Sequence, residues 1–173
     1  MKIFLIGMPG AGKSTLGKQL AERMLLPFID LDKQIERSEN IKIPELFRER
    51  GEEYFREVEA RLLREHSVQQ HSFVMATGGG APCFHQSLEF MKEQGIVVFL
   101  DVALNSIYDR VKNSSDRPLL SLESEEELSQ RLENLRSKRV SFYNQAHITF
   151  SGENLSADSM ANTIMLFKKE AQG

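Results

Sequence analysis

The sequence predicts an α/β domain with a parallel β-sheet, and two observations lead to this prediction. Short apolar runs alternate along the chain with stretches in which apolar residues recur at helical spacing, the pattern of β–α–β units. The run at residues 96–100 is apolar at every position, which indicates a strand covered on both faces. Because 173 residues fit one domain, we expect a single domain over residues 1–173.

Five strands are expected, each a short apolar run. They cover residues 3–6, 28–29, 72–76, 96–100 and 147–150. These patterns do not give the strand order. Parallel sheets bind ligands beyond the carboxyl ends of their strands. The candidate ligand-binding segments are therefore the loops after the first three strands, at residues 7–14, 30–32 and 77–80.

Helices are expected wherever apolar residues recur every three or four positions. The expected helices cover residues 13–25, 44–66, a segment through 88–91, residues 103–111, a segment through 128–135 and a segment through 160–167. Gly51 interrupts the second helix and predicts a break there, and Gly95 ends the third. The polar, serine-rich segment 112–124 predicts a loop.

The composition narrows the functional classes. Lys and Arg number 22 against 25 Asp and Glu, so the basic surplus that is usual in duplex-binding proteins is missing. No stretch approaches the ~18 apolar residues of a membrane span. The single cysteine, Cys83, indicates a reducing compartment. We therefore expect a cytoplasmic monomer with no nucleic-acid or membrane partner.

The strongest motif runs from Gly7 to Ser14. It reads GMPGAGKS and fits the phosphate-loop pattern GxxxxGK[ST] between a strand and a helix. Its glycines let backbone N–H groups turn toward an anion, and the following helix presents its positive end to the same anion. Lys13 is expected to neutralise the β- and γ-phosphates of a nucleoside triphosphate, and the Ser14 hydroxyl to bind Mg²⁺. The alternative is a glycine-rich turn that only enters a helix.

The sequence lacks the motifs of two large classes of phosphate-loop protein, the GTPases and the transporter ATPases. A GTPase would need an Asp-x-x-Gly motif and an Asn-Lys-x-Asp motif, and the sequence has neither. A transporter ATPase would carry a Leu-Ser-Gly-Gly-Gln signature, which is also missing. These absences favour a small kinase.

Two carboxylates, Asp30 and Asp32, follow the second expected strand. Residues two apart on an extended chain face the same side, so both side chains are expected to point into one cleft. One would then serve the metal, and the other would accept a hydrogen bond from a substrate hydroxyl. The alternative is a helix that begins near Lys33 with Asp32 as its N-cap.

Arg56 and Glu59 are three residues apart and are therefore neighbours on a helix. A partly buried Arg56 held by Glu59 would offer a rigid fork to a substrate carboxylate. The alternative is a solvated surface pair. The segment Gly78–Gly80 allows positive φ and close backbone approach, so its amides can contact a ligand; the alternative is a flexible turn.

Arg117 and Arg139 are the remaining candidate cations. An Arg on a polar loop is normally only solvated. Phosphoryl transfer, however, needs cations around the moving group, and mobile lids commonly supply them. Both residues are therefore candidates for the site.

In combination, these residues resemble those of the shikimate kinase family. The resemblance runs from about Met1 to about Phe150. Its marks are the phosphate loop, Asp30-x-Asp32, Phe55-Arg56-x-x-Glu59, Gly78-Gly79-Gly80, Arg117-Pro118-Leu119-Leu120, and Arg139 four residues before Tyr143. The resemblance implies a nucleoside-monophosphate-kinase-like phosphate-loop fold with a five-stranded parallel sheet flanked by helices. It also implies a mobile lid at about 112–124 and substrate-binding helices at about 31–66.

The resemblance further implies an activity, the ATP-dependent phosphorylation of the shikimate 3-hydroxyl on the chorismate route to aromatic amino acids. ATP and Mg²⁺ are then the implied co-substrate and metal. The residues implied to be catalytic are Lys13, Asp32 and Arg117. The residues implied to bind the nucleotide are Gly10, Ala11, Gly12, Lys13, Ser14, Thr15, Arg110 and Arg117. Those implied to bind shikimate are Asp32, Arg56, Gly78, Gly79, Gly80 and Arg139.

Individual roles follow from the same resemblance. Arg56 and Arg139 would hold the shikimate carboxylate, and Asp32 would contact the reacting hydroxyl. Ser14 and Asp30 are implied to serve the metal. Arg110 would pack on the adenine, and Arg117 would reach the phosphates from the lid. Two aromatic residues, Phe47 and Phe55, either line the shikimate pocket or belong to the core.

Two other functions stay open at this point. One is another small-molecule kinase of the same fold, such as a gluconate-type kinase, which also has a phosphate loop and an early Asp-x-Asp. The triple glycine with Arg56 and Arg139 argues against it. The other is a nucleotide-binding module without transfer activity, against which the intact Lys13 and Asp32 argue.

Overall fold

The computed structural model describes residues 1–112, 124–152 and 155–171. Five parallel strands form one sheet in the order β2-β3-β1-β4-β5. Their bounds are β1 Lys2–Ile6, β2 Phe28–Asp30, β3 Phe73–Ala76, β4 Ile96–Asp101 and β5 Ile148–Ser151. The five expected strands and the parallel sheet are therefore confirmed, and the structure adds the strand order.

Helices connect the strands, and most lie where the apolar spacing predicts them. Their bounds are α1 Lys13–Met24, α2 Leu31–Glu39, α3 Ile43–Gln69, α4 Ser87–Gln94, α5 Leu104–Lys112, α6 Glu125–Tyr143 and α7 Ala157–Glu170, with a one-turn 3₁₀ helix, η1, at Ala81–Cys83. Gly51 has φ 81° and ψ 172° within α3, which confirms the expected break. Gly95 follows the last residue of α4, as expected.

The start of α2 differs from the sequence-based prediction. The helix begins at Leu31, and the Asp30 side chain accepts a hydrogen bond from the Lys33 backbone N–H. Asp30 is thus the N-cap, and Asp32 lies in the first helical turn. The expectation that Asp32 caps a helix beginning near Lys33 is wrong. The expectation of an extended chain from Asp30 to Asp32 is also wrong, because the strand ends at Asp30.

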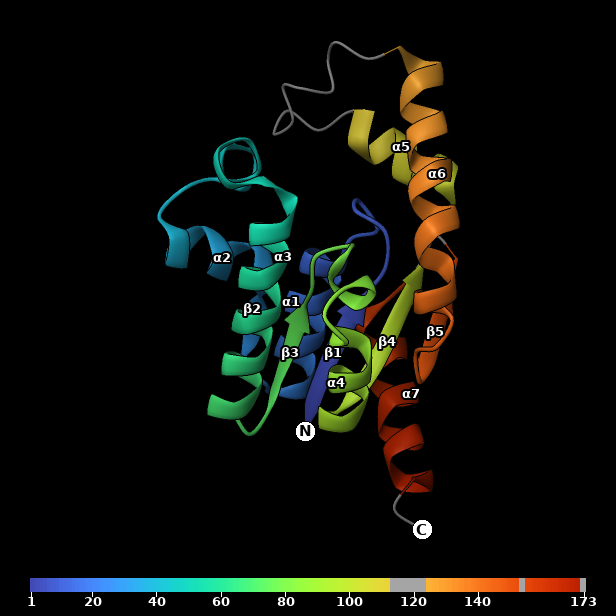
Figure 1. Ribbon diagram of the computed structural model, residues 1–173. Helices are drawn as coiled ribbons and strands as arrows, with labels where there is room; N and C mark the ends of the chain where they lie inside the picture. Colours follow the sequence, from blue (N-terminus) through green and yellow to red (C-terminus); the bar gives the residue numbers. More distant parts are fainter. Residues whose placement is uncertain (113–123, 153–154, 172–173) are drawn as a thin grey trace.

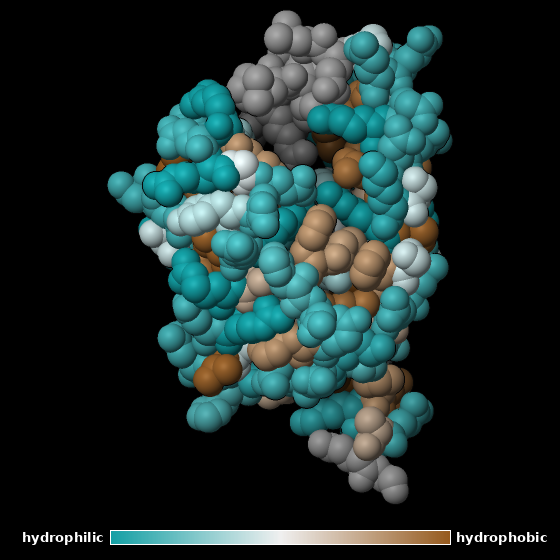
Figure 2. All heavy atoms as spheres, viewed as in Figure 1, coloured by the Kyte–Doolittle hydropathy of each residue, from teal (hydrophilic) through white to brown (hydrophobic). Residues whose placement is uncertain are grey.

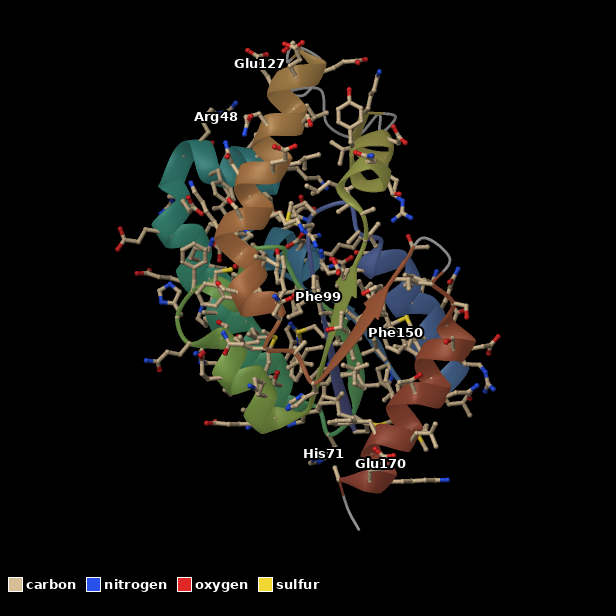
Figure 3. All side chains as sticks on the ribbon, turned by 90° about the vertical axis from the view of Figure 1, so that its right-hand side faces the viewer. Arg48, His71, Phe99, Glu127, Phe150 and Glu170 are labelled. Carbon is tan, nitrogen blue, oxygen red and sulfur yellow. The ribbon has the colours of Figure 1, made fainter. Side chains whose placement is uncertain are left out.

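Helices cover both faces of the sheet (Figures 1 and 3). α1 and α7 pack together on one face, and α3 and α4 lie on the other. The central strands are therefore apolar at consecutive positions: Ile3 to Ile6 of β1 and Val97 to Val98 of β4 have no exposed surface. The sequence-based expectation of a doubly covered strand at 96–100 is confirmed.

The parallel arrangement brings the functional loops together. Because all five strands run in the same direction, the carboxyl ends of β1, β2 and β3 lie at one edge of the sheet. Loops of residues 7–12 and 77–80 follow β1 and β3 there, and Asp30 is the last residue of β2. In Figure 1, α2 and α3 lie on one side of this edge, and α5 and α6 lie on the other.

The visible surface is mainly hydrophilic, with small, scattered apolar groups (Figure 2). Among the described residues, no helix has the length and apolar character needed to cross a membrane. The expected lid at about 112–124, with Arg117, lies outside the described residues except for its two ends.

Close packing of α1 on the sheet depends on Gly17. A Cβ atom at this position would lie 2.9 Å from both Leu5 Cδ1 and Phe28 Cε2, which is closer than real Cβ contacts. Ala is normally favoured over Gly in a helix by about 1 kcal/mol. At Gly17 the overlap with β1 and β2 reverses that preference.

We expect Gly17→Ala to lower the free energy of unfolding by roughly 1–3 kcal/mol, the usual cost of overpacking a core. Denaturant titration measures the change. Lys18→Ala, at the adjacent exposed position of α1, is the matched control and should be neutral or slightly stabilising. If Gly17→Ala stabilises the protein as much as the control does, the close approach of α1 does not constrain this position.

Candidate functional site

The loop after β1 forms an anion cradle. Gly7, Gly10 and Gly12 have φ values of 140°, 81° and 90°, which side-chain-bearing residues rarely adopt. Gly12 is the N-cap of α1, and no side chain of the described residues caps this helix. The first N–H groups of α1 and its positive dipole end therefore face the space inside the loop.

Lys13 adds a positive charge to the same space. Its side chain is buried, and Nζ donates to the backbone oxygens of Gly7 and Met8, at 2.9 Å each. The ammonium is thereby held inside the loop rather than in bulk solvent. Ser14 and Thr15, the next residues of α1, are exposed at the mouth of the cradle.

A pocket of about 280 Å³ adjoins the loop on the α5 side. Residues from four segments line it, namely Ala11, Gly12, Thr15, Leu16, Val102, Arg110 and Leu155. The Arg110 guanidinium lies 3.4 Å from the Gly10 carbonyl oxygen and covers the loop from outside. Apolar walls beside a planar cation suit a flat aromatic ring. The cradle and this pocket together match the phosphate and base ends of a nucleotide.

A second group of polar residues surrounds Arg56 on α3. Its guanidinium is 8% exposed and donates from Nη1 to Glu59 Oε2 at 2.7 Å. Glu52 accepts from the same guanidinium at 3.1 Å, while remaining largely exposed itself. The rings of Phe55 and Phe84 lie 4.9 and 4.6 Å from the guanidinium carbon. The surface-pair alternative for Arg56 and Glu59 is therefore wrong.

Glu59 is the most perturbed acid of this group. Burial raises the pKa of Glu59 to about 7, and the neighbouring charge of Asp32 acts in the same direction. The charges of Arg56 and Arg139 oppose this rise. Oxygen Oε1 of Glu59 is buried without a hydrogen-bond partner among the described residues. This oxygen faces Gly78, where an added Cβ would overlap with it.

The three glycines after β3 are required by space and not by φ. None of Gly78, Gly79 and Gly80 has a positive φ, so the structure does not use the left-handed backbone that three glycines allow here. A Cβ on Gly80 would lie 2.5 Å from Arg56 Nη2, and one on Gly79 would lie 2.7 Å from Cδ of Pro9. The expected close backbone approach is confirmed.

Asp32 and Asp30 occupy different positions in the cleft. Asp32 faces the glycine loop, because its Oδ1 would lie 3.1 Å from a Cβ on Gly78. Asp30 uses Oδ1 to cap α2, which leaves its other oxygen available. The two carboxylates therefore share one edge of the sheet, but each has its own local environment.

Arg139, on α6, lies near enough to the same groups to act on them electrostatically. Its positive charge lowers the pKa of Glu59, the pKa of Cys83 and the pKa of Tyr143, against the larger effect of burial in each case. Arg139 and Arg56 therefore act on one common set of groups from opposite sides. The helix continues without interruption through residues 140–142 to Tyr143.

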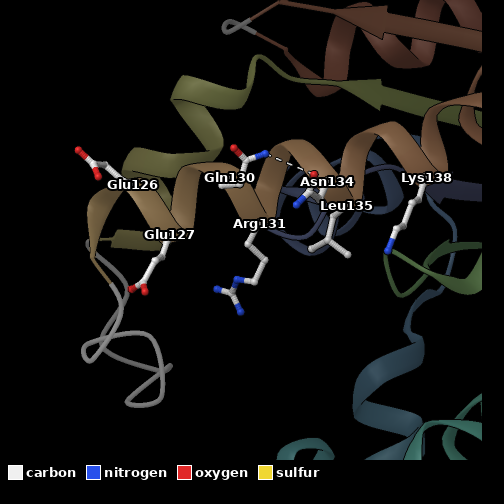
Figure 4. Close-up of a pocket in the computed structure, with 7 residues that line it drawn as sticks. All are labelled: Glu126, Glu127, Gln130, Arg131, Asn134, Leu135 and Lys138. Atoms are coloured by element: carbon white, nitrogen blue, oxygen red, sulfur yellow. Dashed lines mark hydrogen bonds between the residues drawn. The ribbon is translucent and has the colours of Figure 1, made fainter.

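Another hollow, of about 630 Å³, lies along α6 (Figure 4). It is lined by Glu126, Glu127, Gln130, Arg131, Asn134, Leu135 and Lys138. A hydrogen bond of 3.4 Å joins Gln130 Nε2 to Asn134 Oδ1 on this helix. This hollow is larger than the pocket beside the phosphate loop, but it contains no glycine loop and none of the buried charged groups described above. We place the candidate site at the sheet edge instead.

Sequence reasoning missed the roles of two aromatic residues. Tyr143 is completely buried, and its hydroxyl donates to the Gly79 carbonyl oxygen at 2.6 Å. Phe84 covers Arg56 although it comes from the segment after η1. The spacing of Arg139 and Tyr143 on α6 was the available signal for the first. No sequence signal pairs Phe84 with Arg56, because they are 28 positions apart.

This sheet order, with a phosphate loop beside a second charged cleft, defines a phosphate-loop kinase of small molecules. The shikimate kinase family model matches residues 9–168. The chain belongs to the shikimate kinase family, and its recognition from the sequence motifs is thereby confirmed.

Individual relatives agree with this assignment. A shikimate kinase of Sulfurihydrogenibium is 39% identical over 163 residues, which cover 94% of this chain and 95% of that protein. The crystal structure of shikimate kinase from Bacteroides thetaiotaomicron superposes with a TM-score of 0.88 at 37% identity, covering 98% of each chain. The Acinetobacter baumannii shikimate kinase in complex with shikimate gives a TM-score of 0.85 at 35% identity, covering 98% of this chain and 93% of that one.

Glu59 gives the stability of the protein a specific pH dependence. With a folded-state pKa of about 7 and an ordinary value of 4.5, the folded protein holds a proton that the unfolded chain has already released between these values. Stability due to Glu59 is therefore present below about pH 4.5 and is lost as the pH rises to 7. Relative to Glu59→Gln, the wild type should be more stable at pH 5 than at pH 8.

Denaturant titrations of both proteins across this range measure the effect. Glu52→Gln is the control, because Glu52 pairs with the same guanidinium but is 58% exposed. Its stability curve should run parallel to that of the wild type. Parallel curves for Glu59→Gln as well would contradict the effect of burial on Glu59.

Proposed function

We propose that the protein transfers the γ-phosphoryl group of ATP to the 3-hydroxyl of shikimate. The observation that carries this proposal is the convergence of Arg56 and Arg139 on the glycine loop, directly beside an anion cradle. Lys13 in the cradle suits a polyphosphate, and the pair of Arg56 and Arg139 suits a carboxylate. Membership of the shikimate kinase family, and the relative that is in complex with shikimate, support the same choice.

The nucleotide would lie in the cradle of residues 10–15 with its base beside Arg110. Lys13 would leave the backbone oxygens of Gly7 and Met8 for the β- and γ-phosphates, which are stronger partners for an ammonium. The exposed Ser14 hydroxyl and the uncommitted oxygen of Asp30 are hard oxygen donors. They fit Mg²⁺, which usually takes one or two protein oxygens in addition to phosphate oxygens. When bound, the metal would neutralise phosphate charge.

The acceptor would lie over the glycine loop. Arg56 is already fixed by Glu59 and by two aromatic rings, so binding a carboxylate costs it little conformational entropy. Arg139 would hold the same carboxylate from α6. The absence of Cβ atoms at residues 78–80 lets the backbone amides approach the ring. Phe47 and Phe55, whose ring centroids are 4.5 Å apart, would supply the apolar wall.

In the reaction, the acceptor oxygen forms a bond to the γ-phosphorus while the bond from phosphorus to the β–γ bridging oxygen breaks. The hydroxyl proton passes to the Asp32 carboxylate, and ADP leaves. Such transfers have a loose transition state, so alignment and charge stabilisation by Lys13 contribute most of the rate enhancement. Arg117, which lies outside the described residues, completes the proposed catalytic set. Residues 112–124, the lid that the family resemblance implies, lie outside the described residues except at their two ends.

We also propose that residues 1–173 act as a single domain, as a monomer and in the cytoplasm. The single cysteine agrees with a reducing compartment. The near-neutral charge balance agrees with a small-molecule substrate rather than nucleic acid.

A coupled assay of ADP release tests the activity. Purified protein with ATP and Mg²⁺ should release ADP rapidly with shikimate, and only at background rates with gluconate or nucleoside monophosphates. Phosphorus NMR should show a new monoester on the shikimate ring. Lys13→Ala serves as the inactive control. Equal turnover with gluconate, or none with shikimate, would contradict the proposed acceptor.

The role of Asp32 makes a separate prediction. Because general-base catalysis typically contributes at least about 100-fold, Asp32→Asn should lower kcat by roughly that factor. ATP affinity, measured by calorimetry, should change less than about twofold, since Asp32 faces the glycine loop. Asp158→Asn is the matched control, because Asp158 is 76% exposed on α7 and pairs only with Arg23 among the described residues. An unchanged kcat in Asp32→Asn would remove this residue from the chemistry.

A further inference from the structure

Tyr143 lies where the last turn of α6 meets the glycine loop. Its side chain is completely buried, and its ring stacks on Phe99 of β4 with the centroids 5.0 Å apart. Burial raises the pKa of Tyr143 to about 12. The phenol therefore keeps its proton at physiological pH and acts as a hydrogen-bond donor.

The hydroxyl of Tyr143 has two partners. It donates to the Gly79 carbonyl oxygen at 2.6 Å, and it lies 4.0 Å from Sδ of Met8 in the phosphate loop, which is a weak contact. Arg139, one helical turn earlier on α6, is near enough for its positive charge to lower the pKa of Tyr143 against the larger effect of burial. The strong hydrogen bond therefore joins Tyr143 to the glycine loop.

The bond to Gly79 has a geometric consequence. The Gly79 carbonyl and the Gly80 N–H belong to one planar trans peptide, so they point in opposite directions. Fixing the carbonyl toward Tyr143 fixes the direction of the Gly80 N–H. This N–H makes no hydrogen bond to any group in the described part of the chain. Gly80 itself lies against the Arg56 guanidinium, on the acceptor side.

The peptide would otherwise rotate easily. Glycine on both sides removes the steric barriers that normally restrict a peptide plane. Pro9 lies close to Gly79, since a Cβ on Gly79 would lie 2.7 Å from its Cδ. This neighbour limits how far the peptide can move, but it does not form a hydrogen bond with it. In the described residues, the Tyr143 hydroxyl is the one side-chain donor to this peptide.

We propose that Tyr143 is a positioning residue, whose hydroxyl holds the Gly79–Gly80 peptide and orients it for the acceptor. This proposal rests on the proposed function, because it names how a group that would bind the acceptor is aligned. Tyr143 itself touches neither nucleotide nor acceptor. It acts through the backbone N–H of Gly80.

Tyr143→Phe is the direct test, because it removes the hydroxyl and keeps the ring that stacks on Phe99. Loss of one such hydrogen bond should raise the KM for shikimate about tenfold. The KM for ATP should stay within about twofold, since the contact of the hydroxyl with Met8 Sδ is weak at 4.0 Å and Lys13 holds the phosphate loop through the Gly7 and Met8 oxygens. A merely structural role would instead lower thermal stability and alter both KM values together.

Tyr54→Phe is the matched control. The Tyr54 hydroxyl donates to Glu39 at 2.8 Å, outside the cleft, so this variant removes a comparable bond without touching the glycine loop.

A spectroscopic measurement covers the case in which Tyr143→Phe does not fold. The chain contains three tyrosines, so 3-fluorotyrosine labelling gives three ¹⁹F signals, which can be assigned with Tyr54→Phe and Tyr108→Phe. Shikimate should shift the Tyr143 signal and leave that of Tyr54 unchanged. A Tyr143 signal that does not respond to saturating shikimate would overturn the proposal.

The outcomes separate the two proposals. Wild-type protein that does not phosphorylate shikimate overturns the proposed function and, with it, the role of Tyr143. Active wild type with a Tyr143→Phe variant of unchanged shikimate KM overturns only the positioning role. Parallel increases in the KM values for ATP and shikimate also overturn it.

Discussion

The buried ion pair between Arg56 and Glu59 is the interaction on which the arrangement around the glycine loop depends. Removing two charges from water is costly, and a contact of 2.7 Å, together with the aromatic rings around the guanidinium, offsets part of this cost. The remaining cost is visible in the pKa of Glu59, which burial raises to about 7. The pair leaves no room beside it, so Gly78 and Gly80 must lack side chains.

The parallel sheet brings this pair next to the phosphate loop. Each strand ends at the same edge, so segments from residues 7–12 and 77–80 meet although they are about 70 positions apart. A Cβ on Gly79 would lie 2.7 Å from Cδ of Pro9, so the glycine loop packs directly against the phosphate loop. Helix α6 adds the charge of Arg139 near the same groups. Such neighbouring cationic groups suit the proposed transfer between a polyphosphate and a second anion.

Much of the fold was predictable because its signals are local. Strands and helices followed from apolar spacing, and the break at Gly51 followed from its freedom to adopt φ 81°. The N-cap of α2 was not assigned correctly, because Asp30 and Asp32 are both good caps and only the end of β2 decides between them. The glycine loop was recognised, but for partly the wrong reason. Its backbone is ordinary, and it is the neighbouring side chains that exclude a Cβ.

The amino-acid sequence alone determined the phosphate loop and the family. The loop is a contiguous run whose conformation follows from glycine and from the helix that comes next. The family follows from the order of several short motifs between Gly7 and Tyr143, which can be read without the fold. Only the tertiary structure decided that Arg56 and Glu59 are buried and that Tyr143 holds the Gly79 carbonyl. The reason is physical. Burial and hydrogen bonding between residues that are 64 positions apart depend on how the helices pack around the sheet, which no local pattern encodes.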